Sequence, residues 1–409
     1  MPLTADTPPE GAEFAALMAP LGPFGQAPRL AVGVSGGPHS LALALLAHDF
    51  SLARGGEVQA LVVDHGLRPD SAGEAAWTLR TLAAQGIAAD RITLALPRGP
   101  ALQERARTAR LAALLEACAA RGLPWLLLGQ HRMDQAETLL FRALRGSGPA
   151  GLAGMAALRP AAEALILRPL LDMPPARLEA LLRRRGLEPL RDPSNADPRF
   201  TRVRLRTALR DPDGTGAGTA ALAAAARAFA RRRARLEAKV ARRLAGAVAL
   251  HPEGWAQLDP PSLGKDDVAQ AALGALLRLL AGAEHAPAGA AVARLLARGQ
   301  GTLHGVVWKG DRLCREPAAC APPVPARAGA VWDGRWRLLG QPGGEELRWG
   351  ALGTAAAGLD RAARRGLPAR VLAGLPALWR EDCPVGIPCL GLGVAADAVF
   401  APAGGPLSA

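Results

Sequence analysis

Residues 30–40 read LAVGVSGGPHS, in which a run of apolar residues is followed at once by a serine and two glycines. The apolar run predicts a strand buried on both faces, and the residues from about His39 onward predict a helix. Glycines at such a turn let backbone N–H groups approach a ligand closely, and the helix N-terminus adds partial positive charge. The stretch therefore predicts a phosphate-binding loop, with a tight turn that binds no ligand as the open alternative.

The alternation of short apolar runs with longer helical runs continues to about residue 131. Strands are predicted at 30–35, 58–66, 92–97 and 124–131, and helices at 40–50, 75–86 and 101–122. This order predicts an α/β fold with a doubly wound parallel sheet that is covered on both faces. Ligands bind beyond the carboxyl ends of the strands in such sheets. Residues 35–40, 64–71 and 129–138 are therefore the first segments to consider for a site.

A chain of 409 residues is too long for one ordinary domain. We predict an α/β domain over residues 1–210, a Gly/Thr-rich linker over 211–221, a helical domain over 222–325 and a small C-terminal α+β domain over 326–409. The last of these contains four tryptophans, for which packing in a small core is favoured over stacking on bases. They are Trp332, Trp336, Trp349 and Trp379.

The formal net charge is +13, which indicates a polyanionic partner unless an arginine-rich composition by itself accounts for it. The five cysteines form no C-x-x-C pair and are expected to be reduced thiols. The first residues, MPLTADTPPEGAEF, lack the basic and apolar pattern of a secretory signal. Prolines, glycines and an aspartate interrupt the most apolar run, residues 385–402. We expect a cytoplasmic protein with no membrane span, and the sequence leaves homodimer formation open.

Several motifs, in order along the chain, resemble those of the PP-loop family of N-type ATP pyrophosphatases and, within it, the tRNA(Ile)-lysidine synthetases. SGGPHS is similar to the pyrophosphate loop SGGxDS of that family. GQHRMDQAETLLFRALRGSGPAGLAGM is similar to its H-H-x-D-D-Q-x-E-T segment with the RGSG-x-x-GL-x-GM continuation. The other similar blocks are VVDHGLRPDS at 62–71, RPLLDMPPARLEALLRRRGL at 168–187 and DPSNADPRFTRVRLR at 192–206, with weaker similarity at 302–317.

The resemblance implies an adenine nucleotide α-hydrolase-like fold and a two-step reaction. ATP would adenylate carbon 2 of the wobble cytidine in the CAU anticodon of an isoleucine tRNA, releasing pyrophosphate. The side-chain amine of free L-lysine would then displace AMP and leave lysidine. ATP and Mg²⁺ are the implied cofactors, and the tRNA and lysine are the implied partners.

The resemblance also implies a set of nucleotide-site residues. The phosphates of ATP would lie against Ser35, Gly36, Gly37, Pro38, His39 and Ser40, and the adenosine against Asp64 and His65. Ser40 could instead cap its own helix. Asp134, His131, Arg202 and Arg206 are the candidate catalytic residues, and Asp134 is also the candidate metal ligand.

Helical spacing predicts that Asp134, Glu137 and Thr138 share one face, with Asp134 and Thr138 turned toward ATP. Glu137 could equally hold an arginine such as Arg142 or Arg145. Three residues depart from the family pattern, because His39 and Met133 replace acidic residues and Gln130 replaces a histidine. Neither imidazole nor thioether suits magnesium, so these departures predict weakened metal binding.

Arginines account for most of the positive charge and are the candidate RNA contacts. The predicted contacts are Arg107, Arg110, Arg142, Arg145, Arg204, Arg231, Arg232 and Arg235. Two other functions stay open: a tRNA-binding relative that has lost catalysis, and another PP-loop enzyme that modifies tRNA. A thiolating enzyme that uses paired cysteines is disfavoured, since residues 1–210 contain only Cys118.

Overall fold

The computed structural model describes residues 6–66, 70–94, 102–191, 197, 199, 201–343 and 346–402, without the side chains of 102–104. Residues 67–69 of the second motif lie outside this part, as do 192–196, 198 and 200 of the fifth. The chain divides into two compact units, Met1–Arg233 and Ala234–Ala409. Within the described residues, no helix has both the length and the apolar character needed to cross a lipid bilayer.

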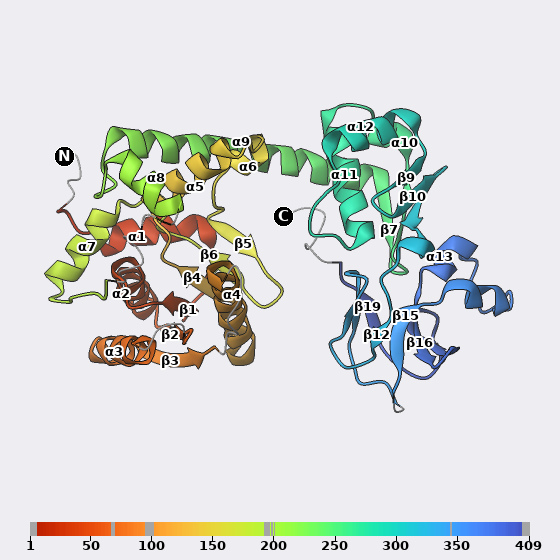
Figure 1. The fold of residues 1–409 in the computed structure, drawn as a ribbon, viewed down its shortest axis with the longest axis horizontal. Coiled ribbons are helices and arrows are strands. Elements are labelled where there is room, and N and C mark those ends of the chain that lie inside the picture. The colour runs from red at the N-terminus through yellow and green to blue at the C-terminus, as the bar shows by residue number, and fades with distance from the viewer. Residues whose placement is uncertain are drawn as a thin grey trace. The chain divides into compact units, whose positions relative to one another are not determined.

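A six-stranded sheet forms the centre of the first unit, with the strand order β3-β2-β1-β4-β6-β5 (Figure 1). Its strands are β1 Arg29–Val34, β2 Glu57–Asp64, β3 Ala88–Thr93, β4 Trp125–Leu128, β5 Leu158–Pro160 and β6 Leu165–Leu167. All neighbouring pairs are parallel except β5 and β6. The predicted doubly wound parallel sheet is therefore confirmed, with one short antiparallel strand at its edge.

Helices pack on both faces of this sheet because successive side chains of each strand point to opposite faces. Leu30, Val32 and Val34 of β1 belong to one apolar core, whereas Ala31 belongs to the other. The first core also contains residues of α1 Gly11–Met18, α2 Pro38–Leu52, α3 Ser71–Ala84 and α7 Pro175–Arg184. The second core contains residues of α4 Leu102–Arg121.

Three further helices complete the part of the first unit that carries the candidate residues. They are α5 Arg132–Leu144, which follows β4, the short α6 Pro149–Leu152, and α8 Thr201–Leu209. Two side chains of α5 form hydrogen bonds with the glycine-rich segment that follows this helix in the sequence. Gln135 exchanges hydrogen bonds of 2.7 and 2.9 Å with the backbone of Met155, and Arg142 donates to the carbonyls of Gly151 and Gly154.

The next helix, α9 Ala217–Ala247, corrects the predicted linker. Only residues 211–216 of the segment 211–221 lie outside a helix, because the alanine-rich sequence after them favours helix strongly. The division between the two units falls inside α9, at Arg233/Ala234, and not at 210/211 or 325/326.

The region predicted to be helical, 222–325, also contains an antiparallel sheet of order β7-β8-β11-β10-β9. Its elements after α9 are β7 Val248–His251, β8 Trp255–Leu258, α10 Pro260–Leu263, α11 Asp267–Ala281, α12 Gly289–Arg298, β9 Gly301–Leu303, β10 Val306–Lys309, β11 Arg312–Arg315 and the first strand of the next sheet, β12 Val324–Pro325. The prediction of a helical domain over 222–325 missed these strands, because strands of three or four residues give too short an alternation to detect.

The C-terminal residues form two small sheets, of order β12-β15-β16-β17-β18 and β13-β14-β19. Their remaining elements are β13 Val331–Trp332, β14 Trp336–Leu338, β15 Arg348–Ala351, α13 Ala369–Ala373, β16 Pro376–Arg380, β17 Cys383–Ile387, β18 Leu392–Gly393 and β19 Ala398–Phe400. Trp332, Trp336 and Trp349 are buried in the core here, as predicted, and Trp379 is partly buried against it.

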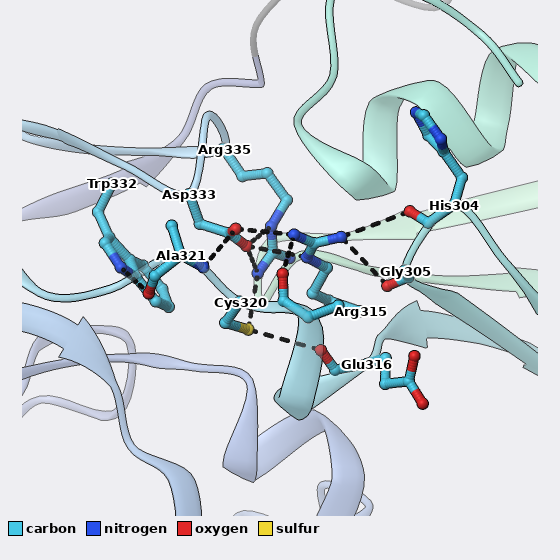
Figure 2. A network of polar contacts seen from close by, with 10 residues as sticks. His304, Gly305, Arg315, Glu316, Cys320, Ala321, Trp332, Asp333 and Arg335 are labelled. Carbon is cyan, nitrogen blue, oxygen red and sulfur yellow. Dashed lines mark hydrogen bonds and ion pairs between the residues drawn. The ribbon is translucent and has the colours of Figure 1, made fainter.

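A buried polar network links β11 to the turn between β13 and β14 (Figure 2). Asp333 accepts hydrogen bonds from Arg315 at 2.9 and 3.1 Å, from Arg335 at 2.7 Å and from the amide of Ala321 at 3.0 Å. Arg335 is 1% exposed. Each charge in this network therefore has an opposite charge beside it.

Candidate active site

The glycine loop between β1 and α2 closes on itself at one end and stays open at the other. The Ser40 hydroxyl accepts a hydrogen bond from the Ser35 amide at 3.1 Å and donates to the Gly37 carbonyl at 3.0 Å. Ser40 therefore stabilises the loop internally, which was the alternative left open for it. No hydrogen bond within the described part of the chain engages the amides of Gly36 and Gly37. These two amides are available to an anion.

Gly36 is required by the shape of this loop. Its φ is +78°, and a Cβ there would lie 2.5 Å from Thr78 Oγ1 and 2.7 Å from Leu190 Cδ1. Its carbonyl accepts a hydrogen bond of 3.0 Å from the Leu190 amide. The loop is thus held between α3 and the segment after α7, with the N-terminus of α2 beside it.

A cavity of about 560 Å³ lies in front of the loop. This volume is in the range of small-molecule sites. The predicted nucleotide residues that line it are Ser35, Gly37, Pro38, His39, Ser40, Asp64 and His65. Four predicted catalytic residues also line it, namely His131, Asp134, Arg202 and Arg206. The fold therefore gathers segments that lie far apart in the sequence around one space.

His39 and His131 stack edge to face in the wall of this cavity, with ring centroids 4.0 Å apart. Burial and the neighbouring His131 lower the pKa of His39 to about 3, and burial also lowers the pKa of His131. Both rings are therefore neutral near pH 7. His39 Nε2 lies 4.0 Å from Glu179 Oε1, beyond hydrogen-bonding distance, and has no partner among the described residues.

Asp134 caps the N-terminus of α5, accepting a hydrogen bond of 2.9 Å from the His131 amide. The same oxygen, Oδ2, lies 3.3 Å from His131 Nε2. Burial by itself would raise the pKa of Asp134, but His131 and Arg206 outweigh it and hold the pKa below its usual value. Asp134 is therefore an ionised carboxylate at the cavity wall.

Asp64 is buried at the end of β2, 4% exposed, and is bonded within the chain. Its carboxylate pairs with Arg91 and accepts a hydrogen bond of 3.0 Å from the Gly66 amide. Burial would raise the pKa of Asp64, but hydrogen bonds from Ser71, Gly66 and Arg91 lower it. Asp64 lines the cavity as a carboxylate whose oxygens are already engaged.

Glu137 holds an arginine, but the partner is Arg206 of α8 and not Arg142 or Arg145. Arg206 Nε donates to Glu137 Oε1 at 2.7 Å, and Glu137 is 1% exposed. Burial raises the pKa of Glu137 in spite of Arg206. The prediction that Thr138 faces the ligand was wrong, since Thr138 is buried and does not line the cavity. Helix spacing gave the shared face but not the direction in which it points.

The arginines predicted to contact RNA separate into two groups. Arg107 and Arg110 of α4 line the cavity together with Arg202. None of these three forms an ion pair or hydrogen bond with another described residue. Burial and the charges of Arg202 and Arg110 lower the pKa of Arg107. The nearby charge of Asp134 opposes this shift. The cavity therefore contains like charges that form no direct ion pair with a carboxylate of the described chain.

The other predicted arginines lie outside the cavity lining. Arg142 is engaged by two backbone carbonyls of the glycine-rich segment, and the Arg145 guanidinium lies 4.5 Å from the centre of the Phe141 ring. Arg204 donates to the Arg199 carbonyl and to Thr201 Oγ1. The three predicted arginines on α9 are exposed, namely Arg231, Arg232 and Arg235.

The described residues do not fit a magnesium site held by protein carboxylates. Met133 is buried, 1% exposed, and Gln130 accepts a hydrogen bond of 3.2 Å from Arg168. Among the described residues, no group of three or more His, Cys, Asp and Glu side chains has the arrangement of a metal site. Asp134 is the predicted ligand, and one of its oxygens is already bonded to His131.

One charged pair in the cavity wall was not predicted from the sequence. Glu179 of α7 and Arg191 both line the cavity and pair at 3.0 Å, and Glu179 faces His39. Glu179 belongs to the amphipathic helix α7 and Arg191 follows that helix. The sequence pattern of α7 indicates only that one face packs against the core. Their sequence distance from the glycine loop concealed them, and no local signal distinguishes them from surface charges.

The loop, the sheet and the cavity at its carboxyl edge define a PP-loop protein. A family model of the PP-loop domain matches residues 11–212. A tRNA(Ile)-lysidine synthase of Ruegeria pomeroyi is 35% identical over 89% of this chain and 89% of its own length. One of Novosphingobium aromaticivorans is 46% identical over 44% of this chain, a match that spans 56% of that relative. The chain therefore belongs to the tRNA(Ile)-lysidine synthase family, whose members are ATP-using ligases that modify tRNA.

One solved structure matches part of this chain. The U34-tRNA thiolase NcsA from Methanococcus maripaludis covers 54% of this chain and 77% of its own, with a TM-score of 0.45 and 16% identity. Similarity at that level carries no information about substrate.

Proposed function

We propose that this protein makes lysidine in an isoleucine tRNA with a CAU anticodon, working in the cytoplasm where ATP, lysine and tRNA are present. The O2 atom of the wobble cytidine attacks the α-phosphate of ATP, and pyrophosphate leaves. The side-chain amine of free L-lysine then bonds to carbon 2, and AMP leaves with the oxygen. The observation that carries the proposal is the unengaged amide of Gly37, which lines a nucleotide-sized cavity, next to the unengaged amide of Gly36 in the same loop.

The phosphates of ATP would be held by backbone and arginine groups. The amides of Gly36 and Gly37 and the N-terminus of α2 supply N–H donors, as in other helix-start anion sites. Arg107, Arg110 and Arg202 supply charge that forms no direct ion pair with a described carboxylate. Arginine forms paired hydrogen bonds with phosphate oxygens, which fixes the nucleotide as well as attracting it.

Asp134, His131, Arg202 and Arg206 are proposed to act on the reacting groups. Neutral His131 and ionised Asp134 would orient the cytidine and the lysine amine at the cavity wall. Arg202 and Arg206 would neutralise the charge that develops on pyrophosphate as it leaves. Glu137 positions Arg206 through its hydrogen bond of 2.7 Å.

Magnesium is proposed to act in the chemical step, with Asp134 as its candidate protein contact. When bound, the ion would withdraw charge from the phosphate oxygens. Its other ligands would be phosphate oxygens and water, because the other described carboxylates at the cavity wall are engaged.

The tRNA is proposed to contact the exposed arginines. Arg145, Arg204, Arg231, Arg232 and Arg235 are exposed and carry charge that can pair with RNA phosphates. These contacts would position the tRNA without reading its sequence.

Mass analysis of the wobble nucleoside after incubation with ATP, lysine and the tRNA tests the proposal. Lysidine that depends on both ATP and lysine is the expected product. ATP and tRNA binding without lysidine would favour the second candidate, a tRNA-binding relative that has lost catalysis, for which His39 and Met133 are the evidence. A thiolated product is not expected, because burial raises the pKa of Cys118 to about 11.

A further inference from the structure

The cavity has too little free carboxylate for a metal and an excess of unpaired positive charge. Arg107, Arg110 and Arg202 have no ion pair or hydrogen bond to any described residue. Positive charges brought together without a counter-ion repel one another, and the structure is stabilised when a polyanion binds between them. This arrangement indicates a ligand that carries several negative charges.

The acidic residues of the cavity wall are already satisfied by protein groups. Asp64 is bonded to Arg91 and Gly66, Asp134 to His131, and Glu179 to Arg191. Glu74, the remaining acidic lining residue, also has a partner in the chain. A hard cation such as magnesium would have to compete with these partners for most of the carboxylate oxygens.

His39, at the start of α2, adds no charge to the cavity wall. Its ring carries no charge near neutral pH and lies against His131, so the position next to the glycine loop contributes neither a metal ligand nor a repulsive charge. A triphosphate oxygen could approach this position without an intervening cation. The loop is thus suited to a bare phosphate chain.

We propose that the cavity binds the triphosphate of ATP without a metal ion, using Arg107, Arg110 and Arg202 with the glycine-loop amides in the role that magnesium would otherwise fill. The inference rests on the proposed function and makes it more specific. Any metal requirement belongs to the chemical step and not to nucleotide binding. Inorganic pyrophosphate, which carries the same charges, binds in the same way.

Calorimetric titration of the full chain with ATP, with magnesium or with EDTA, tests this proposal. We expect the two dissociation constants to agree within about threefold, a difference of under 1 kcal/mol. Arg110→Gln should weaken binding about tenfold in EDTA, the loss of one charge-assisted hydrogen bond. Arg121→Gln is the matched control on the same helix, because Arg121 pairs with Asp90 at 2.8 Å and does not line the cavity. It should leave ATP affinity unchanged.

A second comparison changes the charge beside the loop. In EDTA, His39→Asp should weaken ATP binding at least about tenfold more than His39→Asn does, because it adds a negative charge next to the phosphates. Magnesium should then recover most of the affinity lost by His39→Asp. Circular dichroism shows whether each variant is folded.

The outcomes separate this inference from the proposed function. Wild-type binding that is tight with magnesium and about a hundredfold weaker in EDTA would overturn metal-free binding while lysidine formation still stood. Equal binding of ATP to His39→Asp and His39→Asn in EDTA would also overturn it. If ATP binds under neither condition, both this inference and the proposed function fail.

Discussion

Two regions of this protein are built from arginines and carboxylates with opposite results. In the second unit, Asp333 lies between Arg315 and Arg335, and each of its oxygens accepts hydrogen bonds from them (Figure 2). In the first unit, Arg107, Arg110 and Arg202 meet at a cavity with no described anion bonded to them.

The difference distinguishes a structural charge cluster from a binding site. Buried charges are costly unless paired, so a closed network such as that of Asp333 stabilises one arrangement of the chain and leaves nothing for a ligand. Unpaired arginines at an open cavity keep their binding capacity for an incoming anion. Pairing, more than residue type, tells the two regions apart.

The largest expected effect concerns the exposed arginines. If about six to ten RNA phosphates are contacted, tRNA affinity should fall by roughly three to five decades between about 50 and 200 mM salt. Filter binding over this range measures the slope. The double variant Arg231→Gln/Arg232→Gln should reduce the slope by about two. A flat salt response would mean that these arginines do not bind phosphates.

The closed network should give the largest effect on stability. Asp333→Asn leaves Arg315 and Arg335 without an anion and should lower the free energy of unfolding of the second unit by about 3–5 kcal/mol. Tryptophan fluorescence in denaturant reports this, since six of the eight tryptophans lie after residue 234. Asp311→Asn is the control, because Asp311 is half exposed. A loss similar to that of the control would show that the network is not important for stability.

Arg206 belongs to both kinds of region, since it is paired with Glu137 and also lines the cavity. Arg206→Ala should lower the rate of AMP formation by about 10²–10³-fold, the usual effect of losing a donor to developing charge. Glu137→Gln keeps the arginine and should have a smaller effect. Single-turnover assays measure the rate and calorimetry the ATP affinity. A rate within a few fold of wild type would limit Arg206 to a structural role.

The smallest effect near neutral pH is the pH dependence of stability in the first unit. The pKa of His39 is near 3 in the folded chain and 6.5 ordinarily, so the unfolded chain binds a proton that the folded chain does not. Stability therefore falls as the pH drops below about 6.5, by about 1.4 kcal/mol per pH unit for this group.

Burial also lowers the pKa of His131, so this residue adds to the loss of stability as the pH falls. His39→Asn should reduce the slope of the free energy of unfolding against pH below about pH 6.5 by the contribution of one histidine. Above pH 7 the substitution should not change the pH dependence of stability. Denaturant unfolding followed by circular dichroism at several pH values gives the slope. An unchanged slope would show that the pKa of His39 is the same in the folded and the unfolded chain.

Local patterns were enough for the sheet and the loop. The apolar run ending at Val34 and the glycines after it produce the same strand and turn in the structure, because buried strands and positive φ leave clear residue signatures. The linker prediction was wrong where Gly and Thr preceded a strong alanine helix. Charged residues on helices gave no indication of their partners, as Glu137 and Glu179 show.

The sequence by itself determined the doubly wound sheet, the glycine loop and the family, since each depends on neighbours along the chain. Only the tertiary structure decided which charges are paired. Arg206 meets Glu137, Arg191 meets Glu179, and Arg107, Arg110 and Arg202 are left at the cavity without a described partner. The physical reason is that a charge pair forms across a few ångströms of space, whichever parts of the chain the fold brings there.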